Sequence, residues 1–182
     1  MRKITAVEFV TLDGVAEAPE EWTLPYFNEE LIEIAQAGMD SADAMLLGRQ
    51  TYQDFASYWP HQPREAPFAA WTNDTHKYVV STTLTSLEYG PATQISKDVA
   101  EEVRKLKEQE GKGISLLGSP TLVRSLLPES LIDELSLFLC PIVEGKGKRL
   151  FETPTGELPM RLTGSRVLET GAVALTYAPG AE

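Results

Sequence analysis

The sequence predicts an α/β fold: a mostly parallel central sheet with helices on both faces and an antiparallel pair of strands at its C-terminal end. Short apolar segments rich in β-branched residues alternate with amphipathic segments along most of the chain, which is typical of parallel strands joined by helices. Residues 162–168 and 172–177 have the pattern of strands and are joined by only three residues, which predicts a hairpin. The 182 residues contain no internal repeat and no convincing linker, so we expect one domain over residues 1–182.

Local patterns predict the first elements. Residues 4–10 are rich in β-branched side chains and predict an opening strand, which ends at the turn-forming residues 12–14. Asn28 is expected to cap the N-terminus of a helix whose apolar stripe ends near Gly38. Residues 44–47 are apolar and predict a short buried strand.

The middle of the chain alternates a loop, a strand and a helix. Residues 58–67 contain three prolines and predict a loop. Residues 77–81 predict a strand that runs into a polar turn. Asp98 and Glu101 have the spacing of a capping box, and apolar residues at helical spacing over 99–106 predict the helix that follows.

Two more strands are expected before the hairpin. Residues 114–117 predict a buried strand, which is followed by the segment 118–121 and a short helix that ends near Pro128. Residues 131–143 predict a long strand, because leucines alternate along it.

Composition and charge exclude several classes of protein. The net charge of −11 argues against nucleic acid or an anionic membrane as a partner, and no apolar run approaches the ~20 residues that span a bilayer. Cys140 is the single cysteine, so we expect no internal disulfide and a reducing, cytoplasmic location. His61 and His76 are the only histidines, and no hydrolase or nucleotide-binding signature is present, so no metal site is expected.

The segment Gly118-Ser119-Pro120-Thr121 is the clearest candidate for a binding site. A buried strand runs into a glycine, then into Ser119 as a candidate N-cap and Pro120 as the first helical residue. The free amides of Thr121 and Leu122, together with the helix dipole, would suit a pyrophosphate. The alternative is a helix that is merely well capped.

Two other strand ends carry similar polar turns. Gly48, Arg49 and Thr51 follow the strand 44–47, and the arginine fork and the hydroxyl suit a phosphate; the alternative is a surface arginine paired with a carboxylate. Ser81 and Thr82 follow the strand 77–81. Because ligands of α/β sheets bind beyond the carboxyl ends of the strands, the three turns together predict a site for a nucleotide-sized anion.

Candidates for catalysis and substrate binding lie near the first strand. Asp13 is our candidate for a proton relay or a substrate contact; the alternative is a turn aspartate that caps its own backbone. Glu29 and Glu33 are alternative acids, unless they belong to a solvated helix face. Four aromatic residues are candidates for the wall of a flat-ring pocket, or else belong to the core: Trp22, Tyr26, Trp59 and Trp71.

Four segments also carry a resemblance to a known family: residues 11–14, 45–52, 77–81 and 118–151. Because of the order and spacing of these segments, the chain resembles the dihydrofolate-reductase-like family. The resemblance is specifically to the reductase domain of riboflavin biosynthesis (the RibD C-terminal type). The family often has serine where Thr11 stands and a second glycine where Ser119 stands.

This resemblance implies a sheet of about eight strands, NADPH as the cofactor and a homodimer. It further implies that Gly48, Arg49 and Thr51 line the adenosine-phosphate side, and that Ser81 and Thr82 lie near the 2′-phosphate. Gly118, Ser119 and Thr121 would hold the pyrophosphate. The nicotinamide and the substrate would approach the residues from Thr11 to Gly14. Trp22, one of the four aromatic candidates, is also assigned to the substrate side.

The sequence therefore predicts an NADPH-dependent reductase that transfers hydride to a small heterocyclic substrate, similar to the 5-amino-6-(5-phosphoribosylamino)uracil reductase of riboflavin biosynthesis. Two alternatives stay open at this point. One is a dihydrofolate reductase proper, and the other is a non-catalytic, nucleotide-binding dimer with the same fold.

Overall fold

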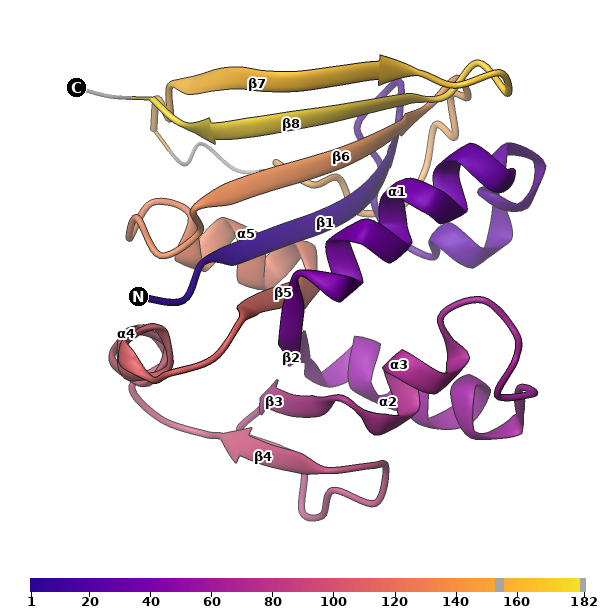
Figure 1. The fold of residues 1–182 in the computed structure, drawn as a ribbon. Coiled ribbons are helices and arrows are strands. Elements are labelled where there is room, and N and C mark those ends of the chain that lie inside the picture. Colours follow the sequence, from indigo (N-terminus) through magenta and orange to yellow (C-terminus); the bar gives the residue numbers. More distant parts are fainter. Residues whose placement is uncertain (153–155, 181–182) are drawn as a thin grey trace.

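The computed structural model describes residues 1–152 and 156–180, which form one eight-stranded sheet in the order β4-β3-β2-β5-β1-β6-β8-β7 (Figure 1). Strands β1 to β6 are mutually parallel, whereas β8 runs antiparallel to both β6 and β7. The predicted fold class is therefore confirmed. The strands are β1 (Ile4–Thr11), β2 (Ala42–Gly48), β3 (His76–Val80), β4 (Ala92–Ile95), β5 (Gly113–Leu117), β6 (Glu134–Cys140), β7 (Met160–Val167) and β8 (Val173–Pro179).

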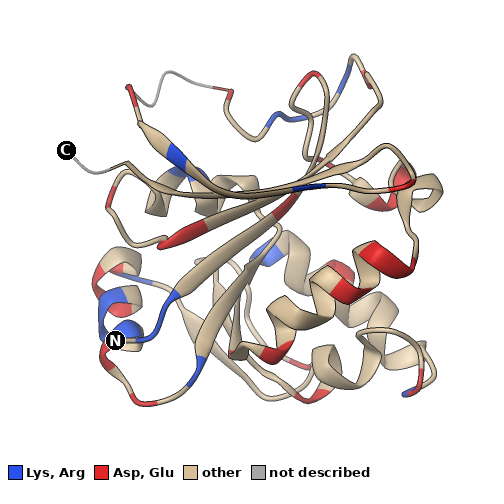
Figure 2. Ribbon diagram, turned by 45° about the horizontal axis from the view of Figure 1, so that its top comes forward, with Lys and Arg blue, Asp and Glu red and all other residues tan. Residues whose placement is uncertain are grey.

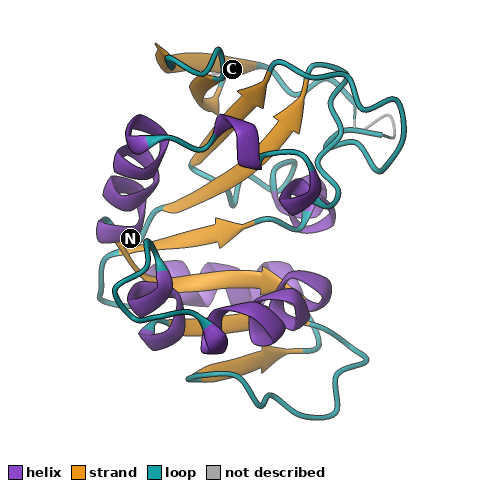
Figure 3. Cartoon of the chain, turned by 90° about the vertical axis from the view of Figure 1, so that its right-hand side faces the viewer, coloured by secondary structure: helices purple, strands orange, loops and turns teal. Residues whose placement is uncertain are grey.

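Helices cover both faces of the sheet (Figure 3). On one face, Ile4, Ala6 and Val10 of β1 pack in an apolar cluster with residues of α4 and α5. On the other face, Val7 and Phe9 of β1 pack against α1, and a separate cluster lies under α2 and α3. The helices are α1 (Glu29–Asp40), α2 (Arg49–Tyr58), α3 (Ala69–Asp74), α4 (Val99–Glu108) and α5 (Pro120–Leu126), with single 3-10 turns at Pro19–Glu21, Leu24–Tyr26 and Trp59–His61.

The three predicted N-caps have different outcomes. The Asn28 side chain accepts a hydrogen bond from the Leu31 amide at 3.0 Å, so this cap of α1 is confirmed. The capping box at Asp98 is wrong, although the helix it was to begin is present. Asp98 has φ 44°, and in this left-handed conformation its carboxylate makes no capping hydrogen bond within the described residues. Like Asp98, Ser119 makes no side-chain capping hydrogen bond within the described residues.

The predicted long strand over 131–143 is too long at both ends. Leu131 is held by α5 instead, because its amide donates to the Leu126 carbonyl at 3.1 Å. At the other end the chain turns after β6, where the Ile142 amide donates to the Cys140 carbonyl. Strand β4 was not predicted, because it is short, polar and the outermost strand of the sheet.

A buried lysine stabilises the region beside α2. Lys77 is fully buried in β3, and its Nζ donates to the carbonyls of Thr75 at 2.8 Å and Asn73 at 3.2 Å. Nζ also lies 4.5 Å from the centre of the Tyr89 ring, and the Tyr89 amide donates to the Tyr52 hydroxyl of α2. Burial lowers the pKa of Lys77 to about 8. These contacts fix α2 against β3.

Acidic segments are spread over loops and helices on the surface, and basic ones are fewer, in agreement with the net charge of −11 (Figure 2). At long range such a protein repels a polyanion, so an anionic ligand requires local donors and cations. Among the described residues, no helix has the length and apolar character needed to span a membrane.

Candidate functional site

The three predicted turns lie along one edge of the sheet, the edge formed by the carboxyl ends of its parallel strands. Because β2, β3 and β5 are parallel, their carboxyl ends, at Gly48, Val80 and Leu117, point the same way. The sheet order puts β2 between β3 and β5, and β1 on the far side of β5. The turns that follow these strands therefore succeed one another along the edge.

Two of the turns contact each other directly. A Cβ added to Gly48 would overlap with Oγ of Ser119, and one added to Gly118 would lie 3.3 Å from Oγ1 of Thr51. Helices α2 and α5 begin at this point, and neither has a side-chain N-cap hydrogen bond within the described part of the chain. First-turn amides of a helix have no partner inside the helix, so donors converge here. We call Gly48, Thr51, Gly118, Ser119 and Thr121 the anion cradle.

The structure corrects one member of the predicted pyrophosphate site. The Leu122 amide donates to the Ser119 carbonyl at 2.8 Å, so it is not free, and the Leu122 side chain is buried in the core. The cause is Ser119, whose φ of 63° tightens the first turn of α5 into an i to i+3 hydrogen bond. The Thr121 hydroxyl accepts from Arg124 at 3.3 Å and stays at the exposed edge.

The left-handed backbone of Ser119 gives a stability prediction. Serine in this region carries a steric cost that glycine avoids, so Ser119→Gly is expected to stabilise the protein by about 1 kcal/mol. Urea unfolding of the two proteins measures the difference. A matched Ser→Gly change at Ser57 in the last turn of α2 should destabilise instead, because glycine is a poorer helix former than serine. A loss of stability in Ser119→Gly would contradict the strain.

Arg49 is exposed beside the cradle, and its guanidinium donates to the Gln53 side chain at 3.0 Å. Within the described residues it forms no ion pair with a carboxylate, so the alternative of a surface ion pair is not what the structure contains. Because the Gln53 side chain is neutral, Arg49 can leave it and bind a phosphate at little electrostatic cost.

Ser81 and Thr82 differ in what they can offer a ligand. Ser81 is buried, and its Oγ accepts from the amides of Thr83 at 3.2 Å and Leu84 at 3.1 Å, which shapes the turn. Thr82 is exposed at the tip. Ser81 thus builds the turn, and Thr82 is the freer hydroxyl.

Strands β1 and β5 stop pairing next to the anion cradle, and we call the place beyond their last pair the gap. The two strands pair only as far as Val7 and Leu117, whereas β1 continues alongside β6 to Thr11. The last contact is the Gly118 amide on the Val7 carbonyl at 3.2 Å. Phe9 lies two residues after Val7, so its N–H and C=O point to the same side of β1, the side of β5. Within the described residues these two groups have no backbone hydrogen-bond partner on that side. The gap thus presents one donor and one acceptor side by side.

Glu8 directly precedes Phe9 in β1. It was not among the predicted site residues. Its side chain is only 3% exposed, and within the described residues its Oε1 has no hydrogen-bond partner. Burial raises the pKa of Glu8 to about 8, and the charge of Arg124 opposes this shift only partly. The alternation of Ile4, Ala6, Glu8 and Val10 already placed this carboxyl on an apolar face, which was the available signal.

Asp13 is held by the loop that follows β6. Its carboxylate accepts from the Thr11 hydroxyl at 2.6 Å and from the amides of Glu144 at 3.1 Å and Gly145 at 2.9 Å. The Thr11 hydroxyl and these amides lower the pKa of Asp13 to about 2. At neutral pH this carboxylate holds no proton to donate. The geometry therefore favours a turn and loop anchor over a proton relay, with Gly14 completing the turn at φ 82°.

This anchoring gives a second prediction. Asp13→Asn keeps the size of the side chain but removes the charge and one acceptor, so the amides of Glu144 and Gly145 should exchange with solvent roughly tenfold faster. The stability that Asp13 adds to the wild type is present above pH 4 and is lost as the pH falls towards 2, because the folded-state pKa is lowered. Amide hydrogen exchange measures the effect. Unchanged protection of both amides would contradict the anchor.

The four candidate aromatic residues do not form one wall. Trp22 is buried, donates from Nε1 to the Glu17 carbonyl at 3.1 Å, and lines a cavity of about 310 Å³ beyond the end of β1. Trp59 and Trp71 pack in the cluster under α2 and α3, and Tyr26 packs against the α1 cluster, so these three belong to the core. The cavity at Trp22 is otherwise lined by Val15, Glu17, Ala18, Glu21, Glu144, Lys146 and Gly147.

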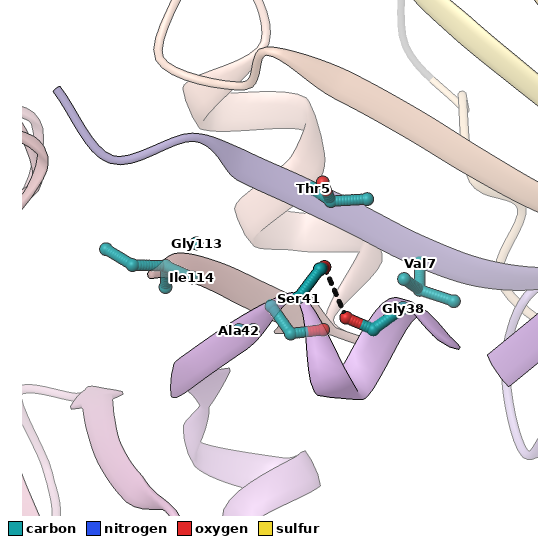
Figure 4. Close-up of a pocket in the computed structure, with 8 residues that line it drawn as sticks. Thr5, Val7, Gly38, Ser41, Ala42, Gly113 and Ile114 are labelled. Carbon is teal, nitrogen blue, oxygen red and sulfur yellow. Dashed lines mark hydrogen bonds between the residues drawn. The ribbon is translucent and has the colours of Figure 1, made fainter. Parts of the chain in front are cut away.

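The other acids and a small cavity on the α1 side are less suited to a substrate. Glu33 and its neighbour Glu30 pair with Arg166 of β7, at 3.7 and 2.9 Å, and Glu29 is exposed, as expected for a solvated helix face. The cavity where α1 ends over β1 and β5 has about 20 Å³, enough for a single water (Figure 4). Ser41 at its rim donates to the Gly38 carbonyl.

A model of the RibD C-terminal domain matches residues 2–174, nearly the whole chain. The chain belongs to this family. Among curated relatives, it is 28% identical over 182 residues to the uncharacterized protein YyaP of Bacillus subtilis, with 97% of this chain and 94% of YyaP covered.

Solved structures share the fold. One is a putative riboflavin biosynthesis protein from Shewanella sp. PV-4, with a TM-score of 0.75, 19% identity, and 98% of this chain and 99% of that chain covered. Another is the dihydrofolate reductase of Enterococcus faecalis, solved with NADP(H), with a TM-score of 0.63, 14% identity, and 98% and 97% covered. The dihydrofolate-reductase-like fold of the family predicted from the sequence is thus confirmed.

Proposed function

We propose that this chain is an NADPH-dependent reductase that transfers hydride to a small heterocyclic substrate. The observation that carries the proposal is the sequence of features along the carboxyl edge of the sheet: the turn after β3, the anion cradle between β2 and β5, and the gap between β5 and β1. Neighbouring strands lie about 4.8 Å apart, so these features are spaced like the successive parts of a dinucleotide.

The residues of the edge fit such a cofactor. The cradle offers helix amides and hydroxyls to a diphosphate, and glycines at 48 and 118 let the two turns approach each other, because a Cβ at these positions would meet Ser119 and Thr51. Arg49, Ser81 and Thr82 lie on the side where a 2′-phosphate would extend. The free N–H and C=O of Phe9 match the acceptor and donor of a carboxamide. When bound, the cofactor supplies the hydride; this chain holds and orients it.

The substrate end of the proposed site is the turn after β1. Thr11 is the last residue of β1 and Gly14 lies in the turn after it. The cavity lined by Trp22 adjoins the same turn, because Val15, whose amide donates to the Thr11 hydroxyl, also lines it. We therefore assign Thr11, Gly14 and Trp22 to the substrate side, with Asp13 positioning the loop over it. The family likeness favours a substrate such as that of the 5-amino-6-(5-phosphoribosylamino)uracil reductases.

Binding of NADPH to the isolated protein tests the proposal. Titration calorimetry should give a dissociation constant in the micromolar range or tighter, and the melting temperature should rise because the ligand binds only the folded state. Gly48→Ala, whose Cβ would meet Ser119, should weaken binding. Gly38→Ala is the matched control, because a Cβ there meets nothing within 4 Å. No binding at millimolar NADPH would refute the reductase.

Two further expectations belong to the same proposal. NADPH oxidation assayed with dihydrofolate and with the ribosylaminopyrimidine separates a dihydrofolate reductase from a riboflavin-type reductase, and binding without turnover would favour the non-catalytic alternative. We also propose, from the family likeness, a homodimer in the cytoplasm, which light scattering tests as a mass of twice 20.1 kDa.

A further inference from the structure

We propose that the buried carboxyl of Glu8 faces the nicotinamide end of the bound cofactor and is ionised only when the oxidised, positively charged ring is present. This inference rests on the proposed function. It assigns to Glu8 the discrimination between NADP⁺ and NADPH.

Glu8 lies at the point of β1 where pairing with β5 ends. β5 leaves the sheet after Leu117, opposite Val7, so Glu8 is the first residue of β1 beyond the last pair with β5. On its other side β6 continues, with Leu137 in register with Glu8. Glu8 is therefore the residue of β1 at which the gap begins, one position before Phe9.

Oε1 of Glu8 has no hydrogen-bond partner within the described residues. A buried carboxyl normally finds hydrogen-bond partners, since leaving such an atom unpaired costs free energy. Glu8 forms no hydrogen bond or ion pair that involves the described residues, and its Oε1 is fully enclosed. A partner supplied by a ligand in the gap would remove this cost.

The surroundings contain little charge that could replace that partner. On the same face lie Ala6 and Val10 of β1, Leu116 of β5 and Leu137 of β6, all apolar. Arg124 of α5 is the charged group that acts on Glu8.

The guanidinium of Arg124 is already engaged. It donates to the carbonyls of Arg149 at 2.8 Å and Leu150 at 3.1 Å and to the Thr121 hydroxyl. Arg149 in turn donates to the Asp13 carbonyl. A positive ring in the gap would thus be an uncommitted partner for a Glu8 carboxylate.

Charge balance then distinguishes the two forms of the cofactor. The reduced ring is neutral and is compatible with the protonated carboxyl. The oxidised ring is a cation, so its binding breaks the O–H bond of Glu8 and passes the proton to the buffer, which leaves a buried carboxylate facing a buried cation. A nearby positive charge favours the ionised form of a carboxyl, so the bound oxidised ring itself favours the loss of the Glu8 proton.

Proton release on binding tests the proposal without any substrate. Calorimetry at pH 7 in two buffers of different ionisation enthalpy counts the protons released when NADP⁺, NADPH and 2′,5′-ADP bind. We expect wild type to release close to one proton more with NADP⁺ than with NADPH or 2′,5′-ADP, which lacks the nicotinamide. The Kd for NADP⁺ should also tighten by about tenfold per pH unit up to pH 8.

Variants separate the possible outcomes. Glu8→Gln, which keeps the size but cannot ionise, and Glu8→Leu should both abolish the extra proton, while Glu134→Gln in β6 should keep it. Equal proton release with NADP⁺ and NADPH in wild type, or an extra proton that persists in Glu8→Gln, would overturn the assignment. Failure of all three ligands to bind wild type would instead refute the proposed function on which the assignment rests.

Discussion

Replacing Arg49 by alanine is expected to weaken NADPH binding by roughly 10- to 150-fold and to leave NADH binding almost unchanged. Arg49 is exposed at the start of α2 and is held only by the neutral side chain of Gln53. A hydrogen bond to a charged phosphate contributes about 1.5–3 kcal/mol, which gives that range of affinity. NADH lacks the 2′-phosphate, so the arginine has no such contact to lose.

Dissociation constants of both cofactors for wild type and Arg49→Ala decide this prediction. Arg64→Ala is a matched control, because Arg64 is also exposed but pairs with Asp74 away from the cradle. The net charge of −11 makes the local cation more important, since the whole protein repels a polyanion. Equal losses for the two cofactors would mean that Arg49 supports the shared diphosphate and not the 2′-phosphate.

Glu8→Gln is expected to change how the free energy of unfolding depends on pH. The folded-state pKa of Glu8, about 8, lies above the ordinary value of 4.5. Between these two values the folded wild type binds more protons than the unfolded chain, so its stability falls as the pH rises. The stabilising contribution is complete below pH 4.5 and is lost by pH 8, and glutamine does not titrate.

The difference between the two proteins should therefore shift by roughly 3–5 kcal/mol in favour of Glu8→Gln from pH 4.5 to pH 8. Urea unfolding at half-unit steps of pH measures it. Lys77 titrates in the same range, but it is present in both proteins and cancels in the difference. A difference that stays constant with pH would show that Glu8 is ionised in the folded protein at neutral pH.

Local sequence patterns predicted the fold and the strand-to-helix turns at Gly48 and Gly118 well, because strand ends, glycines and proline are local features. The strands before Gly48 and Gly118 and the helices after them are both present. The direct contact between Gly48 and Ser119 could not be predicted, since it depends on the pairing of β2 with β5 across a large separation in sequence.

The contacts that the sequence did not predict have the same origin. The loop that holds Asp13 lies more than 130 residues away, so the carboxylate looked free for catalysis in the sequence. Leu122 looked like a free amide because the left-handed φ of Ser119 is not encoded by any simple pattern. Glu8 was the avoidable omission, because a glutamate at an inward position of an alternating strand is already unusual.

A crystal structure of this chain with NADPH tests the central claim most directly. We expect the diphosphate within hydrogen-bond distance of Thr51, Ser119 and Thr121, and the nicotinamide carboxamide against the free N–H and C=O of Phe9. A diphosphate bound elsewhere, for example in the cavity lined by Trp22, would contradict the assignment of the anion cradle and with it the direction of the cofactor along the edge of the sheet.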